Sequence, residues 1–237
     1  MTHNRQSAIN IHAKRALRES AMTPLAAPAA SAPGIDVSRH NGLIHWQRVK
    51  RLGIQFAYIR ATMGAQGHDS QFDANWQGAQ SAGLPFLGAY HYFTSDQSGD
   101  SQAKNFISSF SGVGNLPPVV DVEPRYNEIL NDAQRQAFSA QLRLWLEIVQ
   151  REAEIHPAIY TRFSAWPAMT TEPMWARDYP LWVAHYTDDL APRLPAPWTD
   201  YLIWQWTDKG RFYGIAGNVD LNLWRSDARR AGPGGGE

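Results

Sequence analysis

The stretch Leu116-Pro-Pro-Val-Val-Asp-Val-Glu-Pro124 predicts a buried strand that ends in two carboxylates. Residues two apart on a strand point to the same face, so Asp121 and Glu123 share one side, roughly 6–7 Å apart along the backbone. Val119 shares that face, whereas the other two valines point the opposite way. Glycoside hydrolysis requires such a pair, because one acid donates a proton and the other stabilises developing positive charge. Taken alone, the pair is equally consistent with a charged strand end that meets solvent.

Strand-like and helix-like segments alternate along the chain on both sides of this stretch. Alternation of this kind predicts a parallel sheet, and about eight strands in one chain of this length predict a compact, irregular β/α barrel. Apart from the strand at 116–124, the expected strands are 34–38, 56–62, 84–93, 158–161, 181–186, 201–206 and 218–224, and the expected helices are 46–52, 73–82, 101–110 and 132–151.

Two further acids are predicted to join the pair. Active sites of such barrels lie at the carboxyl ends of the strands. Asp36 and Asp220 each stand between two apolar residues of a strand, so we expect them to face the barrel interior while their neighbours face the helices. The first and last strands of a closed barrel are neighbours, which would bring both acids beside Asp121 and Glu123. Four carboxylates in one cleft raise the pKa of at least one of them.

Aromatic side chains are predicted on the same inner face. The alternation of 181–186 turns Trp182 and Tyr186 inward, and Tyr160 and Tyr90 are further candidates. Aromatic rings pack on the C–H faces of sugars, but for any one of these residues ordinary core packing is the better explanation.

The composition excludes several classes of function. Lys+Arg and Asp+Glu both total 22, so no bulk attraction to nucleic acid or to an anionic membrane is expected. Cysteine is absent, which excludes disulfides and cysteine-based zinc sites. The sequence lacks a Gly-x-Ser-x-Gly elbow, a P-loop, a dinucleotide-binding glycine motif and His-Glu-x-x-His spacing. We therefore expect no metal and no cofactor.

The two ends of the chain differ from its middle. Residues 9–20 could form a short basic amphipathic helix, and a Pro/Ala-rich linker follows, so residues 1–33 are either a disordered leader or a docking element. Residues 34–226 would form the barrel, and the Gly-rich 227–237 a flexible tail. The sequence contains neither an apolar run long enough to span a membrane nor a standard secretory signal.

Together these motifs resemble the glycoside hydrolase family 25 lysozymes, the Chalaropsis-type muramidases. The resemblance covers residues 34 to about 225. One departure is Met63, which stands where the family often has an acid. The landmarks are Gly34-Ile-Asp-Val-Ser38, Tyr58-Ile-Arg-Ala-Thr62, Gly88-Ala-Tyr-His-Tyr92, Asp121-Val-Glu123, Ile159-Tyr-Thr161, Leu181-Trp-Val-Ala-His-Tyr-Thr187, Ile203-Trp-Gln-Trp206 and Val219-Asp-Leu-Asn222.

The resemblance implies a modified TIM-like barrel of eight strands and five helices, and cleavage of the β-1,4 bond between N-acetylmuramic acid and N-acetylglucosamine in peptidoglycan. It makes Glu123 the general acid and base, and Asp121 the residue that orients the substrate's own 2-acetamido group, giving retention. Asp36 and Asp220 would set the charge around that pair. The sugar subsites would be lined by Tyr90, Tyr160, Tyr186, Gln205 and Trp206.

Two alternatives remain open at this point. The barrel could be a non-catalytic wall-binding or structural component of a phage tail or secretion apparatus, or a hydrolase of another amino-sugar polymer such as chitin. The four acids argue against the first, and the apolar residues before Asp121 disfavour the second. For a muramidase, the expected place of action is the bacterial cell wall or periplasm, reached by phage-type release or injection. We expect a monomeric catalytic domain.

Overall fold

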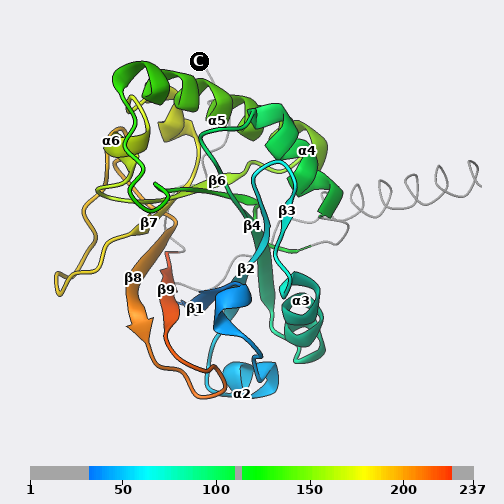
Figure 1. The fold of residues 1–237 in the computed structure, drawn as a ribbon. Helices are drawn as coiled ribbons and strands as arrows, with labels where there is room; N and C mark the ends of the chain where they lie inside the picture. Colours follow the sequence, from blue (N-terminus) through cyan, green and yellow to red (C-terminus); the bar gives the residue numbers. More distant parts are fainter. Residues whose placement is uncertain (1–31, 110–113, 226–237) are drawn as a thin grey trace, which may run out of the picture.

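A computed structural model describes residues 32–109 and 114–225 of the chain (Figure 1). The predictions for the N-terminal basic segment and for the Gly-rich tail fall outside these residues, apart from Ala32 and Pro33, which belong to the first strand. None of the described helices has the length and apolar character needed to cross a membrane.

Eight strands close into a barrel, as expected from the alternating pattern (Figure 1). Hydrogen bonds run around it in the order β1-β9-β8-β7-β6-β5-β4-β2, and β2 pairs with β1 to complete the circle. A short ninth strand, β3 (Gly67–His68), folds back on β2. The barrel strands are β1 (Ala32–Val37), β2 (Phe56–Met63), β4 (Phe86–Tyr92), β5 (Val119–Val122), β6 (Ala158–Arg162), β7 (Leu181–Ala184), β8 (Ile203–Gly210) and β9 (Val219–Trp224).

The last strand departs from the parallel arrangement that the alternation predicted. Six of the eight pairings around the barrel are parallel, but β9 runs antiparallel to both β8 and β1. A parallel pair needs a crossover connection of a dozen or more residues, and only 211–218 separate β8 from β9. The chain therefore turns back directly and enters the last position from the opposite end.

Five α-helices lie in the described part of the chain, and Figure 1 shows α5 and α4 side by side against the barrel. The longest, α5, begins with a capping box in which the side chains of Asn131 and Gln134 bond to each other's backbone N–H. Its apolar residues recur at helical spacing and pack on the outside of the sheet. The helices are α2 (Trp46–Arg51), α3 (Phe72–Ser81), α4 (Gly99–Ser109), α5 (Asp132–Ala153) and α6 (Trp166–Met169), with 3-10 turns at Arg39–Asn41 and Met174–Asp178.

Two apolar layers hold the barrel together, one between strands and helices and one inside it. The inner layer is mostly aromatic. The rings of Phe56 and Trp224 meet edge-on with their centroids 5.7 Å apart, and the ring centroids of Tyr58 and Trp182 lie 4.9 Å apart. Gly34 is required here, because a Cβ at its position would lie 2.2 Å from the Phe56 ring. These rings fill the barrel at the amino ends of the parallel strands and leave the opposite mouth for polar residues.

Candidate active site

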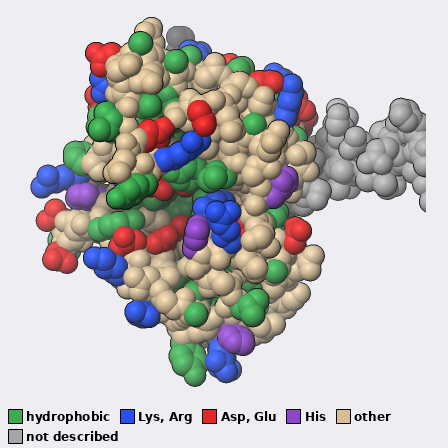
Figure 2. Space-filling model, viewed as in Figure 1, with side chains coloured by type: hydrophobic (Ala, Val, Ile, Leu, Met, Phe, Trp, Pro, Cys, Tyr) green, Lys and Arg blue, Asp and Glu red, His purple; other side chains and the backbone are tan. Residues whose placement is uncertain are grey.

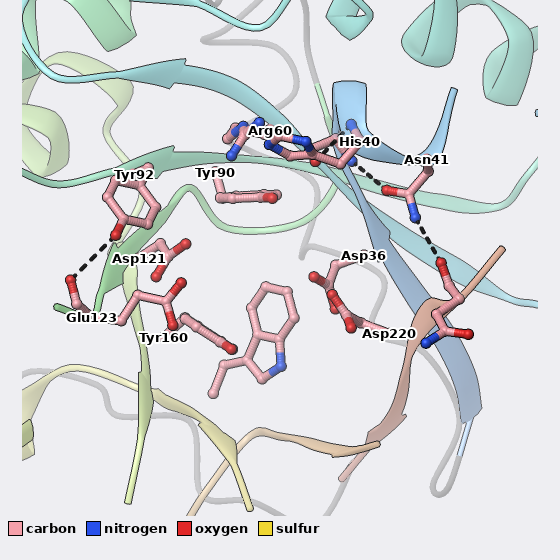
Figure 3. Close-up of a pocket in the computed structure, with 13 residues that line it drawn as sticks. Asp36, His40, Asn41, Arg60, Tyr90, Tyr92, Asp121, Glu123, Tyr160 and Asp220 are labelled. Atoms are coloured by element: carbon pink, nitrogen blue, oxygen red, sulfur yellow. Dashed lines mark hydrogen bonds between the residues drawn. The ribbon is translucent and has the colours of Figure 1, made fainter. Parts of the chain in front are cut away.

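A cavity of about 250 Å³ opens at the carboxyl ends of the parallel strands, where the rules for such barrels place the active site. Figure 2 shows a hollow on this face of the molecule, with acidic, basic and hydrophobic side chains gathered around it. Figure 3 shows that the acids point into it from different strands. The lining residues are Asp36, Ser38, His40, Asn41, Arg60, Tyr90, Tyr92, Asp121, Glu123, Tyr160, Trp182, Asn218 and Asp220.

All four acids singled out from the sequence therefore meet in one cavity. Asp36 on β1 and Asp220 on β9 are direct partners in the strand pairing, so they face each other across neighbouring strands. Asp121 on β5 and Glu123 just after it enter from the other side of the cavity (Figure 3). Val119 belongs to the inner layer, and Val120 and Val122 to the outer one, which confirms the alternation expected for this strand.

Asp36 is held by two amide side chains. Its Oδ2 accepts hydrogen bonds from Gln205 Nε2 at 2.8 Å and from Asn222 Nδ2 at 2.7 Å. Sequence analysis placed Gln205 in a sugar subsite, but it lies behind the cavity wall and is 2% exposed. Its direct contact is with Asp36, and a role toward the sugar stays a prediction.

The two amides are themselves oriented by aromatic donors. Tyr160 and Tyr186 both donate their hydroxyl hydrogen to Gln205 Oε1, at 2.9 and 2.8 Å. The Trp182 indole N–H likewise donates to Asn222 Oδ1 at 2.8 Å. Since an amide oxygen only accepts, these donors fix the NH₂ group of each amide toward Asp36.

Burial and mutual repulsion shift the acids toward their protonated forms. Burial raises the pKa of Asp220 to about 9, and the charge of Asp36 and a hydrogen bond with it add to the shift. The pKa of Asp36 is also raised by burial, although the bonds from Asn222 and Gln205 oppose this. The pKa of Asp121 is raised well above the usual carboxyl value, first by burial and then by the charges of Glu123 and Asp36. Of these acids, Asp220 therefore keeps its proton at neutral pH.

Glu123 differs from the other acids because it has a cationic partner. Its carboxyl Oε2 lies 2.8 Å from Arg162 Nη2, and its side chain is 24% exposed. Burial raises the pKa of Glu123, whereas the Arg162 charge lowers it. Tyr92 donates its hydroxyl to the Glu123 backbone carbonyl at 3.5 Å (Figure 3).

Arg60 on β2 supplies a second cation, and it lies beside Tyr90 in the cavity wall (Figure 3). Its Nε bonds to Asp69 Oδ2 at 2.9 Å, and Asp69 also accepts from the backbone N–H groups of Arg39 and Gln71. The Nη2 atom of Arg60 is buried and has no hydrogen-bond partner among the described residues. That nitrogen adds a donor beside the acids.

Several of these residues were missed in the sequence. Arg60 and Arg162 each lie two residues after an inward tyrosine, Tyr58 and Tyr160, so the strand alternation already placed both on the inner face. Asn222 stands two residues after Asp220 and follows the same rule. The period of two would therefore have identified all three.

Two of the aromatic candidates lie outside the cavity lining. Tyr90 and Tyr160 line it, whereas Tyr186 lies beyond the end of β7 and bonds to Gln205 behind the cavity wall. Trp206 on β8 is 38% exposed. Their contact with sugar stays a prediction. Among the described residues, no group of three or more His, Asp or Glu side chains is arranged to hold a metal ion.

Comparison with known proteins agrees with this geometry. The model of the family "Glycosyl hydrolases family 25" matches residues 35–215. Lysozyme M1 of Streptomyces globisporus is 33% identical over 219 residues, covering 86% of this chain and 71% of its own length. An N,O-diacetylmuramidase of Chalaropsis sp is 27% identical over 203 residues, covering 79% and 95%.

A solved structure shows the same fold. The crystal structure of the bacterial lysozyme from Streptomyces coelicolor superimposes with a TM-score of 0.74 at 30% identity, and the match covers 85% of this chain and 95% of that one. Fold, family model and relatives agree, and the chain belongs to glycosyl hydrolases family 25.

Proposed function

We propose that this cavity cleaves the β-1,4 bond between N-acetylmuramic acid and N-acetylglucosamine in peptidoglycan, with Glu123 as the general acid and base. The protein is a peptidoglycan hydrolase of the lysozyme type, in keeping with its family and with relatives named lysozyme and N,O-diacetylmuramidase. The observation that carries the assignment of the site is the meeting of Asp36, Asp121, Glu123 and Asp220 at the barrel mouth. A purely wall-binding module has no need of four acids whose burial is costly.

Glu123 fits the role of proton donor. Its side chain is 24% exposed and lines the cavity, so a glycosidic oxygen can reach it. Burial raises its pKa, which is the direction that a general acid requires. In the first step Glu123 protonates the leaving oxygen. In the second step the resulting carboxylate takes a proton from the attacking water.

Asp121 fits the role of the residue that positions the substrate's acetamido group. It shares the strand face of Glu123, and its Oδ1 has no hydrogen-bond partner among the described residues. An N–H of the 2-acetamido group would satisfy that oxygen and bring the acetamido oxygen to C1. Attack by that oxygen and then by water inverts C1 twice, so the product retains its configuration. NMR detection of the α-anomer as the first product would overturn this mechanism.

Asp36 and Asp220 complete the proposed site on its other side. The two amide donors keep Asp36 in place, and the raised pKa of Asp220, about 9, makes that residue a proton-bearing neighbour near neutral pH. Tyr90 and Tyr160 line the cavity, and burial raises the pKa of each well above its ordinary value, so both keep their hydroxyl hydrogen. The hydrogen of Tyr160 goes to Gln205, so its oxygen can only accept from a sugar hydroxyl, whereas Tyr90 can donate.

The protein acts at the bacterial cell wall, in keeping with its lysozyme relatives. Residues 34–226 are proposed as a monomeric catalytic unit, and residues 1–33 as a docking element for phage-type release or injection. Deleting residues 1–31, which leaves β1 whole, should impair delivery or partner binding and leave hydrolysis of isolated peptidoglycan intact. Unchanged delivery and partner binding would refute the docking role.

The primary experiment compares the wild type with Glu123→Gln on purified peptidoglycan. Products are reduced with borohydride and identified by mass spectrometry. Glu147→Gln is the matched control, since Glu147 is an exposed glutamate on α5. We expect muropeptides that end in reduced N-acetylmuramic acid, and a rate roughly 10²–10⁴-fold lower in Glu123→Gln only.

Other outcomes have equally clear meanings. Ends carrying reduced N-acetylglucosamine would identify a glucosaminidase and refute the proposed bond. Absence of products from folded wild-type protein on several cell walls would refute catalysis and favour the wall-binding alternative. Equal activity of Glu123→Gln and the wild type would refute the assigned acid.

A further inference from the structure

Arg162 forms an ion pair with Glu123, and no other Arg or Lys in the described part of the chain pairs with one of the four cavity acids. The sequence patterns assigned Arg162 no role. Its Nη2 lies 2.8 Å from Glu123 Oε2. The Arg162 side chain is 42% exposed, so it lies at the edge of the cavity rather than in the core. Its Nε is buried and has no hydrogen-bond partner among the described residues.

The ion pair is built into the register of two strands. Val122 on β5 is the strand partner of Thr161 on β6. The residues that follow, Glu123 and Arg162, therefore lie side by side at the ends of the two strands. The Thr161 hydroxyl donates to the Val122 carbonyl at 2.8 Å, which ties the strands together directly before the charged pair. The two charges are therefore brought together by backbone pairing and do not depend on a flexible surface encounter.

Glu123 lies in the field of several other charged and titratable groups. The acids are Asp121 on its own strand, Asp36 on β1 and Asp220 on β9. The tyrosines are Tyr92 on β4 and Tyr160 on β6, while Tyr186 after β7 acts on Arg162. The cations are Arg60 on β2 and Arg162 on β6.

The two cations are not equivalent. Arg60 is engaged by Asp69, which is 1% exposed and takes up its charge at 2.9 Å. Arg162 instead contacts Glu123 itself. Burial and the neighbouring acids favour the protonated form of Glu123, and Arg162 is the contact that opposes them.

We propose that Arg162 is a positioning residue for Glu123, which holds its carboxyl group at the cavity wall and sets the pH at which it releases its proton. The inference rests on the proposed role of Glu123 as general acid and base. A residue with both duties must release its proton in the first step and recover one in the second. Without a cation, Glu123 would hold its proton too tightly for the first step.

The test uses the full chain and three variants. Arg162→Gln removes the charge, and Arg162→Lys keeps it. Arg151→Gln is the control, since Arg151 pairs with Glu152 on the exposed face of α5. Two quantities are measured for each protein: the pH dependence of kcat and KM on soluble peptidoglycan fragments, and the Glu123 carboxyl titration by ¹³C NMR, assigned by comparison with Glu123→Gln.

We expect Arg162→Gln to move the alkaline limb of the kcat/KM profile and the NMR titration to higher pH, both by roughly one to two pH units. Loss of the fixed carboxyl position should also lower kcat roughly 10-fold or more, with a smaller change in KM. Arg162→Lys should shift the titration much less, because it keeps the charge, and yet lose part of kcat because it lacks the fork geometry. Arg151→Gln should match the wild type.

Superimposable pH profiles and NMR titrations of wild type and Arg162→Gln would overturn the inference while the wild type still cleaves peptidoglycan. Equal titration shifts in Arg162→Gln and Arg162→Lys would overturn the role of charge. A wild type that releases no fragments would instead refute the proposed function. Near-UV circular dichroism checks that each variant is folded, and Arg162→Lys keeps the test decisive if Arg162→Gln does not fold.

Discussion

Replacing His91 with glutamine should make the folded barrel less sensitive to acid. His91 lies on β4 with no exposed surface, and its ring stacks on Trp145 of α5 at 5.6 Å. Its Nδ1 lies 2.7 Å from the Thr62 hydroxyl and its Nε2 lies 3.3 Å from Gln102 Oε1. Gln102 Oε1 only accepts, so Nε2 carries the hydrogen and Nδ1 accepts from Thr62. This arrangement satisfies a neutral ring and offers a charged one no carboxylate.

The size of the effect follows from the pKa of the buried ring. Burial lowers the pKa of His91 to about 3, whereas an unfolded chain has a histidine pKa of about 6.5. Between these values the unfolded chain binds more protons, so the free energy of unfolding falls as the pH is lowered. The contribution lost is about 2 kcal/mol at pH 5 and roughly 4 kcal/mol at pH 3. Typical domains have only about 5–15 kcal/mol of stability.

The cavity acids act in the opposite direction, so the comparison must be made between variants. Their raised pKa values mean that the folded protein takes up protons on acidification, which stabilises it. The contribution of the cavity acids to the free energy of unfolding is the same in the wild type and in His91→Gln. It therefore cancels when the stabilities of the two proteins are subtracted.

Urea unfolding followed by tryptophan fluorescence at pH 7.5, 6 and 5 measures that difference. The stability advantage of wild type over His91→Gln at pH 7.5 should shrink by about 2 kcal/mol at pH 5. The control His45→Gln, at an exposed position, should follow the wild type at every pH. Parallel curves for wild type and His91→Gln would show that His91 takes up its proton in the folded state, and would refute the reasoning.

Two further predictions concern the supports of the site. Asn222→Ala removes a donor from Asp36 and leaves the Trp182 indole N–H without its acceptor. The free energy of unfolding in urea should therefore fall by about 3 kcal/mol, and the release of muropeptides should also fall. An unchanged free energy of unfolding would contradict the role of this network. Asp69→Ala removes the partner of the largely buried Arg60 and should cost about 3–5 kcal/mol in the same assay. Asp69→Asn keeps an oxygen for one of the two backbone donors, which bond to different carboxylate oxygens, and should cost less; equal losses would refute the importance of the backbone bonds.

The meeting of the acids could be predicted because it depends on local rules. Apolar neighbours on both sides fixed the inward direction of Asp36 and Asp220, and barrel closure then made their strands adjacent. The structure places them as direct partners. The same period of two placed Asp121 and Glu123 on one face.

Other features depend on contacts that a linear pattern does not contain. The pairing of Arg162 with Glu123 requires the register between β5 and β6, although its inward direction was readable. The register of β8 against β9 shifts between Gln205 and Thr207, so alternation assigns no direction to Trp206. The reversed direction of β9 follows from a short connection whose path is decided by closure of the whole barrel.

The reversed last strand has a consequence for how the protein is made. The hydrogen bond between Asn222 and Asp36 joins residues 186 positions apart, one in the last strand and one in the first. A growing chain on the ribosome therefore exposes Asp36 long before the residues that hold it have been synthesised. Contacts of such sequence separation form late, because the loop-closure entropy must be overcome first. The nascent chain therefore lacks the complete four-acid cavity until β9 has left the ribosome and docked.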